Sequence, residues 1–306
     1  EGVLVHTTAG DLEAGRVVLA TGTPVLDRGL YFAKVTAQRS YVAAYRVPGD
    51  RVAGLEPGMY LSAGSPTRSV RTAPLTAEDG RGGAPLTIGD PRELLLIGGN
   101  GHGVGRDPDT RAQAADLDAW TRDRFPGAEL LHEWSAQDYQ SANRIPFVGT
   151  LPRSRGRVFV ATGYGKWGMT NGVAAALRIA GEITDDAPAW VRVLGRRVTR
   201  PVSIGAGALE NAEVGVAYAA GWGGAETAAD REPAEGEGVV TARAGRPVAI
   251  CRVGGVVRER SAVCPHLAAV VSWNGAERSW DCPAHGSRFD ADGALLEGPA
   301  TRGLAE

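Results

Sequence analysis

Two short segments near the carboxyl end carry the residue types best suited to chemistry. One is Cys-Pro-His at residues 264–266, and the other is Cys-Pro-Ala-His at residues 282–285, with fifteen residues between them. Each segment offers one thiolate sulfur and one imidazole nitrogen from a loop tightened by proline. Two cysteines on one iron and two histidines on the other form the ligand set of a Rieske-type [2Fe–2S] centre. The sequence therefore predicts such a centre, with Cys264, His266, Cys282 and His285 as its ligands.

A structural zinc site is the alternative for the same four side chains, because zinc also accepts two cysteines and two histidines. Zinc sites usually pair two cysteines in one knuckle, whereas each segment here pairs a cysteine with a histidine. The third cysteine, Cys251, ends the apolar run 248–251, where we expect a small buried side chain. So few cysteines, without a disulfide framework, favour the cytoplasm.

The sequence around the four candidate ligands resembles that of Rieske proteins. Residues 261–267 (SAVCPHL) resemble the first Rieske box, residues 280–290 (WDCPAHGSRFD) the second, and residues 298–300 (GPA) the proline loop that covers the cluster. Many Rieske proteins have two further cysteines that cross-link the loops, and Ala269 and Ala284 stand at those positions here. The resemblance implies a cluster without that cross-link, in which Ser287 donates a hydrogen bond to a cluster sulfur.

The composition of the 306-residue chain argues against two classes of partner. A formal net charge of −2 argues against nucleic acid, which needs a basic surface. No apolar run approaches the roughly 18 residues of a membrane helix, so we expect no membrane span. The chain opens in a strand-like run at residues 2–5 without a signal segment, and we expect it to be a fragment or a processed product of a longer chain.

The order of sequence patterns predicts an α+β protein with two domains. Residues 1–200 mix strands and helices, with strands at 94–97 and 158–161, a helix opening at Asp107-Pro108 and another helix with Val173, Leu177 and Ala180 on its packed face. Residues 201–232 are rich in alanine and glycine, and we expect a short helix and a linker there. Residues 233–306 have short strands between glycine turns, which is typical of a small all-β module.

A glycine-rich run at residues 163–168 (GYGKWG) lies between a predicted strand and a predicted helix. Alone it would indicate a dinucleotide-binding turn, but no clear return strand of a βαβ unit follows. Together with residues 134–139, 145–149, 160–164 and 167–172, it resembles the D-amino-acid-oxidase-like FAD-dependent oxidoreductases, and within them a bacterial group that ends in a Rieske domain. Residues 69–71 and 96–102 fit the same group.

This resemblance implies that residues 1–200 form the part of an FAD-dependent oxidoreductase domain that holds the flavin ring and much of the substrate site. Free N–H groups at the start of a helix would stabilise negative charge on the reduced ring. The family's glycine fingerprint for the FAD diphosphate is absent, which implies that a domain-sized piece precedes this sequence. The expected FAD-binding residues are Thr21, Gly22, Gly163, Trp167, Gly168, Met169 and Thr170.

Three charged or titratable residues near these motifs are candidates for catalysis or binding. Arg71 could clamp a substrate carboxylate through its guanidinium fork, or it could form a salt bridge at a strand edge. His102, in an expected glycine loop at 98–102, could carry a proton, or it could order that loop by a hydrogen bond. Lys166 lies beside the expected ring position, where it could tune the flavin or simply be solvated.

The function implied by the resemblance is that of a dehydrogenase acting on the C–N bond of an amine or amino acid. A hydride would pass to FAD, and single electrons would then pass to the [2Fe–2S] cluster and to an external acceptor. The alternative is an electron carrier or a truncated remnant without flavin or turnover. The expected partners are the small-molecule substrate and the external electron acceptor.

Overall fold

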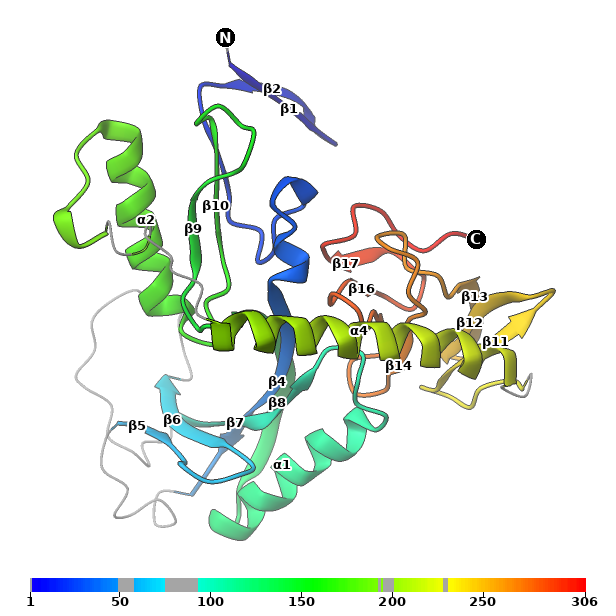
Figure 1. The fold of residues 1–306 in the computed structure, drawn as a ribbon. Coiled ribbons are helices and arrows are strands. Elements are labelled where there is room, and N and C mark those ends of the chain that lie inside the picture. The colour runs from blue at the N-terminus through cyan, green and yellow to red at the C-terminus, as the bar shows by residue number, and fades with distance from the viewer. Residues whose placement is uncertain (1, 49–57, 75–92, 192–193, 195–200, 228–230) are drawn as a thin grey trace.

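The computed structural model describes residues 2–48, 58–74, 93–191, 194, 201–227 and 231–306 (Figure 1). Two bodies lie side by side, and one long helix, α4 (Pro201–Thr227), runs across both of them. The larger body contains helices α1 (Thr110–Arg124) and α2 (Gly168–Thr184) and three of the five sheets of the described residues, and the smaller body is all-β. This arrangement confirms the α+β class, whereas the domain boundaries at 1–200, 201–232 and 233–306 remain a prediction.

A five-stranded antiparallel sheet forms the centre of the larger body. Its strands follow the order β5-β6-β7-β4-β8. Along β4, side chains at odd-numbered positions are buried and those at even-numbered positions are half-buried as far as Val42, because successive side chains of a strand point to opposite faces. The bounds are β4 (Val35–Arg46), β5 (Met59–Leu61), β6 (Arg68–Pro74), β7 (Glu93–Gly103) and β8 (Glu129–Ser141).

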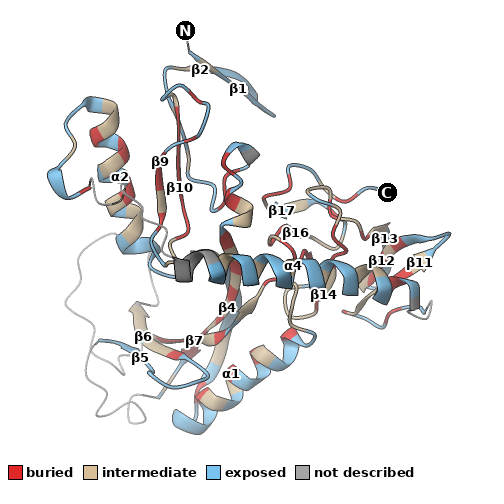
Figure 2. Cartoon of the chain, in the orientation of Figure 1, coloured by how far each residue is buried: buried red, intermediate tan, exposed pale blue. Residues whose placement is uncertain are grey.

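Helix α1 (Thr110–Arg124) covers part of the odd-numbered face of β4, and Tyr41, Tyr45 and Leu117 pack together there (Figure 2). The helix begins two residues later than the expected Asp107-Pro108 start. Asp109 is its N-cap and accepts a hydrogen bond from Ala112 N at 3.0 Å. Asp107 instead accepts from Asp109 N at 2.8 Å, in a turn that leads into the helix.

The glycine run 98–102, expected as a loop, belongs to β7. A Cβ on Gly98 would lie 2.6 Å from Ser69 Oγ, and one on Gly99 would lie 2.8 Å from Thr67 O. Glycine is therefore needed here because the neighbouring segment approaches the backbone closely. Asn100, in the left-handed region, coincides with an irregularity in the β4–β7 register.

A smaller sheet of three strands has the order β3-β10-β9, with β3 (Val17–Leu19) parallel to β10 (Val158–Thr162) and β9 (Phe147–Thr150) antiparallel to β10. The amino-terminal segment forms three strands: β1 (Val3–Thr7) pairs with β2 (Gly10–Ala14), and β3 joins this other sheet. The remaining short elements are 3₁₀ helices: η1 (Asp27–Gly29), η2 (Tyr31–Ala33) and η4 (Ala189–Val191).

Helix α2 (Gly168–Thr184) packs on this sheet through Ala175 and Ile179. The prediction that Val173, Leu177 and Ala180 form its packed face is wrong, because all three are exposed. The helix is apolar on both faces, so its periodicity could not decide which face would be buried.

The smaller body consists of two antiparallel sheets around a core that includes Trp280, Phe289 and the fully buried Cys251. The prediction of a small all-β module is confirmed. The first sheet comprises β11 (Gly238–Arg243), β12 (Arg246–Val253) and β13 (Val256–Ser261). The second comprises β14 (Ser272–Asn274), β15 (Ser279–Asp281), β16 (Arg288–Phe289) and β17 (Leu295–Glu297).

Helix α4 (Pro201–Thr227) occupies most of the segment where a short helix and a linker were expected. Its alanines favour a helix, and its glycines permit close packing rather than a break. A Cβ on Gly221 would lie 3.0 Å from Val270 Cβ, and Trp222 Nε1 donates to Ala268 O at 3.1 Å. Within the described ranges, no helix has the length and apolar character needed to cross a membrane.

A buried ion cluster joins the two bodies. Arg39 Nη2 on β4 lies 2.7 Å from Glu277 Oε2, and Arg288 Nη2 lies 3.2 Å from the same oxygen. Ser135 N donates to Glu277 Oε1 at 2.9 Å. Burial favours a raised pKa for Glu277, but the bond from Ser135 and the charges of Arg39 and Arg288 lower it on balance. The carboxylate is therefore charged at neutral pH and connects both bodies.

Replacing Glu277 by alanine is expected to destabilise the protein by about 3 kcal/mol, because it leaves the buried Arg39 without its counter-charge. The measurement is the free energy of unfolding by urea at neutral pH. Glu259→Ala, which removes an exposed partner of Arg243, is the control and should cost less than about 1 kcal/mol. Equal effects of the two changes would contradict the role assigned to Glu277.

Candidate functional site

The two predicted cysteine ligands lie together in the core of the smaller body. The thiols of Cys264 and Cys282 are hydrogen-bonded to each other, and this bond lowers the pKa of Cys264 to about 7 while that of Cys282 is raised. Backbone N–H groups of His266 and Leu267 point at the Cys264 sulfur, and those of Ala284 and His285 at the Cys282 sulfur. Both sulfurs thus lie among donors that favour thiolate, the form that binds iron.

The two predicted histidine ligands form a separate pair beside the sulfurs. The rings of His266 and His285 meet edge to face, with their centroids 5.1 Å apart. Burial, followed by the charges of His266 and Arg106, lowers the pKa of His285 to about 4, so this imidazole is neutral at neutral pH. His285 Nδ1 is buried and has no hydrogen-bond partner among the described residues, which leaves it available to a metal.

This arrangement fits a two-iron cluster better than a single zinc ion. In the part of the chain that the structure describes, no three histidine, cysteine, aspartate or glutamate side chains are grouped closely enough to hold one metal ion. A sulfur pair beside a nitrogen pair is what a Rieske centre requires, because each pair serves its own iron. Cys264, His266, Cys282 and His285 remain the predicted ligands of this cluster.

Ser287 and the proline loop complete the surroundings of the sulfurs. The fully buried Ser287 hydroxyl is hydrogen-bonded to Cys264, as the resemblance implied, and accepts a bond from Ala300 N at 3.0 Å. The loop 298–300 is therefore tied to the cysteine side of the site. Ala269 and Ala284, at the positions of the missing cross-link, are both buried.

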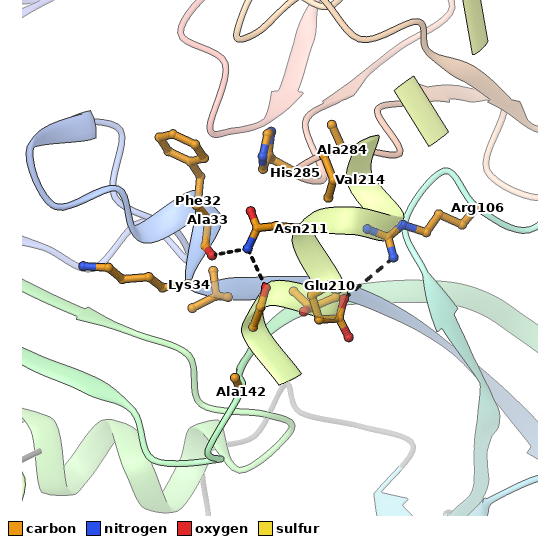
Figure 3. A pocket seen from close by; sticks show the side chains of 13 residues that line it. Phe32, Ala33, Lys34, Arg106, Ala142, Glu210, Asn211, Val214, Ala284 and His285 are labelled. Atoms are coloured by element: carbon orange, nitrogen blue, oxygen red, sulfur yellow. Dashed lines mark hydrogen bonds and ion pairs between the residues drawn. The ribbon is translucent and has the colours of Figure 1, made fainter. Parts of the chain in front are cut away.

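The histidine pair faces a side chain from the larger body, which the sequence did not reveal. Phe32, in η2, meets His266 and His285 edge to face, with centroid distances of 4.8 and 4.9 Å. Figure 3 shows Phe32 beside His285 at a small pocket that α4 closes. Asn211 Nδ2 on α4 donates to Ala33 O there at 3.1 Å. The cavity has a volume of about 20 Å³ in which the centre of a water molecule fits, roughly enough for one water molecule.

The expected FAD-binding glycines lie together at one edge of the three-stranded sheet. Gly22 follows β3 and Gly163 follows β10, so both stand at the carboxyl ends of neighbouring parallel strands, where ligands of α/β sheets commonly bind. Both adopt left-handed backbone conformations, with φ of 72° and 81°, which favour glycine. Thr162 Oγ1 donates to Gly22 O and joins the two turns.

The start of α2 continues this edge of the sheet. Gly168 opens the helix, and Trp167, Met169 and Thr170 are exposed around its amino end. Thr21, on the other turn, donates its hydroxyl to Thr23 O at 2.7 Å. Glycine turns beside a helix amino terminus fit an anionic, flat cofactor group.

Arg71 and His102 do not form one catalytic site. Arg71 pairs with Leu96, and Leu96 with Ala44, so Arg71 shares the even-numbered face of β4. His102 pairs with Arg39 on the opposite face, where its ring stacks on Tyr41 and its Nε2 lies 3.2 Å from Tyr41 Oη. His102 thus lies on the face of the sheet that also carries the buried Tyr41.

The ammonium group of Lys166 lies closer to the glycine turns than the guanidinium group of Arg71 does. A Cβ on Gly101 would lie 2.7 Å from Lys166 Nζ and 3.3 Å from Ser40 Oγ, so the ammonium reaches the even-numbered face next to the glycine turns. Arg71 lies level with Ala44, four residues or about 13 Å further along the sheet. Burial raises the pKa of Asp138 nearby, although the charge and backbone N–H of Lys166 oppose this. The positive φ of Lys166 was not foreseeable from sequence.

Sequence comparison matches two segments of the chain to known protein families. Residues 1–181 match the family described as FAD dependent oxidoreductase, and residues 225–306 match the Rieske [2Fe-2S] domain. The chain belongs to the FAD-dependent oxidoreductase family. The resemblance seen in the sequence is confirmed, and the two matches imply FAD and a [2Fe–2S] cluster as the cofactors of this oxidoreductase.

Individual relatives match very different shares of this oxidoreductase chain. The Rieske 2Fe-2S iron-sulfur protein YhfW of Bacillus subtilis is 27% identical over 293 residues, 91% of this chain and 52% of its own length. The cytochrome b6-f complex iron-sulfur subunit 1 of Nostoc sp. is 53% identical over 45 residues, 15% of this chain and 25% of its own. The chain therefore spans about half of the Bacillus relative.

Among solved structures, glycine oxidase from Geobacillus kaustophilus is similar to part of this chain. It has a TM-score of 0.46 and 21% identity, and the match covers 61% of this chain and 46% of that protein. The Rieske protein PetC3 from Synechocystis matches with a TM-score of 0.21 and 30% identity, over 22% of this chain and 71% of that protein.

We expect the anaerobically purified protein to contain one [2Fe–2S] cluster per chain, with the paramagnetic resonance of a Rieske centre after reduction. Cys264→Ser should abolish that signal and most of the iron. Cys251→Ala is the control, because it removes the buried thiol that lies outside both cluster loops. Stoichiometric zinc without iron in the wild type would contradict the assignment.

Ser287→Ala is expected to lower the potential of the cluster by on the order of 60 mV, because one hydrogen bond of about 1.4 kcal/mol to a cluster sulfur favours the reduced state. A redox titration followed by paramagnetic resonance measures the shift. Ser279→Ala removes another buried hydroxyl of the same domain, bonded to Asp281, and should leave the potential unchanged. A wild-type potential in the variant would show that Ser287 does not control the cluster.

Proposed function

We propose that this oxidoreductase oxidises the C–N bond of an amine or amino acid and passes the electrons from FAD to its own [2Fe–2S] cluster, from which an external acceptor takes them. The observation that carries this proposal is the contact of Phe32 with both candidate histidine ligands. A Rieske cluster exchanges electrons most readily at its less buried, histidine-bearing iron. Here that edge faces the flavin half of the same chain.

The segment from Phe32 to Val35 connects the two cofactor sites over a short stretch of chain. Phe32 contacts the histidines, and a Cβ on Gly163 would lie 3.4 Å from Val35 Cγ1. On the same strand, Ala37 Cβ would lie 2.3 Å from a Cβ on Gly286, beside His285. The start of β4 therefore contacts a glycine turn of the expected FAD site at Val35 and a cluster loop at Ala37, two positions on the same face of the strand.

FAD, when bound, takes a hydride from the carbon attached to nitrogen and can release its two electrons singly, as a one-electron cluster requires. The protein groups suited to the substrate lie on the even-numbered face of β4. Lys166 could hold a substrate carboxylate, and Asp138 could hold an ammonium group or accept its proton. A cation and a carboxylate near the glycine turns suit a zwitterionic amino acid.

The location proposed for the oxidoreductase is the cytoplasm. Cys251, Cys264 and Cys282 are all free thiols, and two of them are the proposed cluster ligands. A reducing compartment is compatible with this use of cysteine.

The test is anaerobic addition of a panel of amines and amino acids to the protein loaded with FAD and cluster. A substrate should bleach the flavin absorbance and then produce the paramagnetic signal of the reduced cluster. Bleaching without cluster reduction would contradict the electron path, and an inert flavin beside an intact cluster would favour an electron carrier without turnover.

With an amino-acid substrate found in that panel, Lys166→Met is expected to raise KM about 10- to 100-fold, because a charged hydrogen bond to a carboxylate contributes roughly 1.5–3 kcal/mol. Arg71→Met is the matched control and should change KM little, since Arg71 lies further along the sheet. Steady-state kinetics measures both variants. A larger effect at Arg71 would reverse the assignment of the two cations.

A further inference from the structure

Tyr139 lies between the two proposed cofactor sites and is only 4% exposed. It stands near the end of β8 and pairs with Ala37 of β4, on the face where Val35 and Ala37 contact the two sites. Because Tyr139 contacts residues of both proposed sites, its contacts show how the flavin half and the cluster half are held in fixed positions relative to each other.

On the flavin side, Tyr139 contacts both glycine turns. A Cβ on Gly22 would lie 2.9 Å from Tyr139 Cε2, so the ring packs directly against the backbone of that turn. The carbonyl oxygen of Tyr139 accepts a hydrogen bond from Gly165 N at 3.0 Å. The ring and the main chain of one residue thus touch the two segments expected to hold FAD.

On the cluster side, the phenol contacts the proline loop. Tyr139 Oη accepts from Gln137 Nε2 at 2.9 Å and lies 3.3 Å from both Glu297 Oε1 and Gly298 O, to which it can donate its one proton. Gln137 Nε2 also donates to Gly286 O at 2.8 Å, next to His285. The loop continues to Ala300, whose N–H bonds Ser287, and Ser287 in turn bonds Cys264.

The phenol remains neutral in this environment. Burial raises the pKa of Tyr139 strongly, and the neighbouring Glu297 carboxylate adds to the effect. Burial also raises the pKa of Glu297, which the charges of Arg288 and Arg39 partly oppose. A neutral phenol can donate a hydrogen bond to a carboxylate or carbonyl.

We propose that Tyr139 is a positioning residue that holds the proline loop of the cluster at a fixed distance from the flavin turns and thereby sets the rate of electron transfer between them. This inference rests on the proposed function. Each transfer moves one electron from the reduced flavin to the cluster iron, with no bond made or broken in Tyr139. The rate depends steeply on the separation of the centres, so a small change in the loop position has a large effect.

The experiment compares Tyr139→Phe with the wild type, both loaded with FAD and cluster. A laser flash that injects one electron into the protein is followed by the absorbance changes of flavin and cluster as they equilibrate. Removing the hydroxyl should slow this equilibration several-fold, while the flavin content and the cluster potential stay at wild-type values. Tyr45→Phe is the matched control, because it removes a buried phenol of the same sheet that bonds Asp118 on α1.

The outcomes separate this inference from the proposed function. No exchange between flavin and cluster in the wild type would remove the proposed function itself. Exchange at the wild-type rate in Tyr139→Phe would overturn the role of Tyr139 and leave the proposed function standing. A slower rate accounted for by a shifted cluster potential would also overturn it, because Tyr139 would then tune the cluster rather than position it. Gln137→Leu, which removes the bonds to both Tyr139 and Gly286, should slow the exchange as well.

Discussion

The alternation of side chains along β4 is the constraint on which the rest of the structure depends. Because neighbouring side chains point to opposite faces, this strand can be buried on one face and remain accessible on the other. Its odd-numbered residues lie under α1 and the Rieske domain, through contacts that include Arg39 with Glu277 and Ala37 with Gly286. Its even-numbered residues lie on the face that Lys166 reaches from the flavin turn. One strand therefore holds both cofactor halves at a fixed separation.

Buried charge makes the docking of the two halves specific. A buried ion pair contributes little net stability over apolar packing, but an unpaired buried charge is costly. Arg39 lies in the larger body and Glu277 and Arg288 in the smaller one, so another docking would leave the buried Arg39 without its counter-charge. Close backbone approaches add a steric requirement, since a Cβ on Gly105 would lie 2.8 Å from both Asp281 O and Pro283 N. Charge and shape together select the arrangement in which Phe32 meets the histidines.

Local features of the structure could be predicted closely from the sequence, whereas features that need distant partners could not. The end of α1 before Pro126 follows from the inability of proline to continue a helix. The glycines of 98–102 were expected as a loop because glycine usually weakens a strand, yet here the neighbouring segment requires them. The prediction of which face of α2 is packed was wrong for a related reason. Two faces of the helix are apolar, and only the sheet on which it packs decides which of them is buried.

The sequence by itself predicted the cluster ligands and identified the two families, because cysteine–histidine pairs in short loops bring their donors together through local chain geometry. The tertiary structure decided how the remaining site residues are grouped. It placed His102 and Arg71 on opposite faces of one sheet, and it brought Lys166 to that sheet. It also set Phe32 and Tyr139 against cluster loops more than a hundred residues away in sequence. Strand register and domain docking control these contacts, and both are settled by the packing of the whole chain.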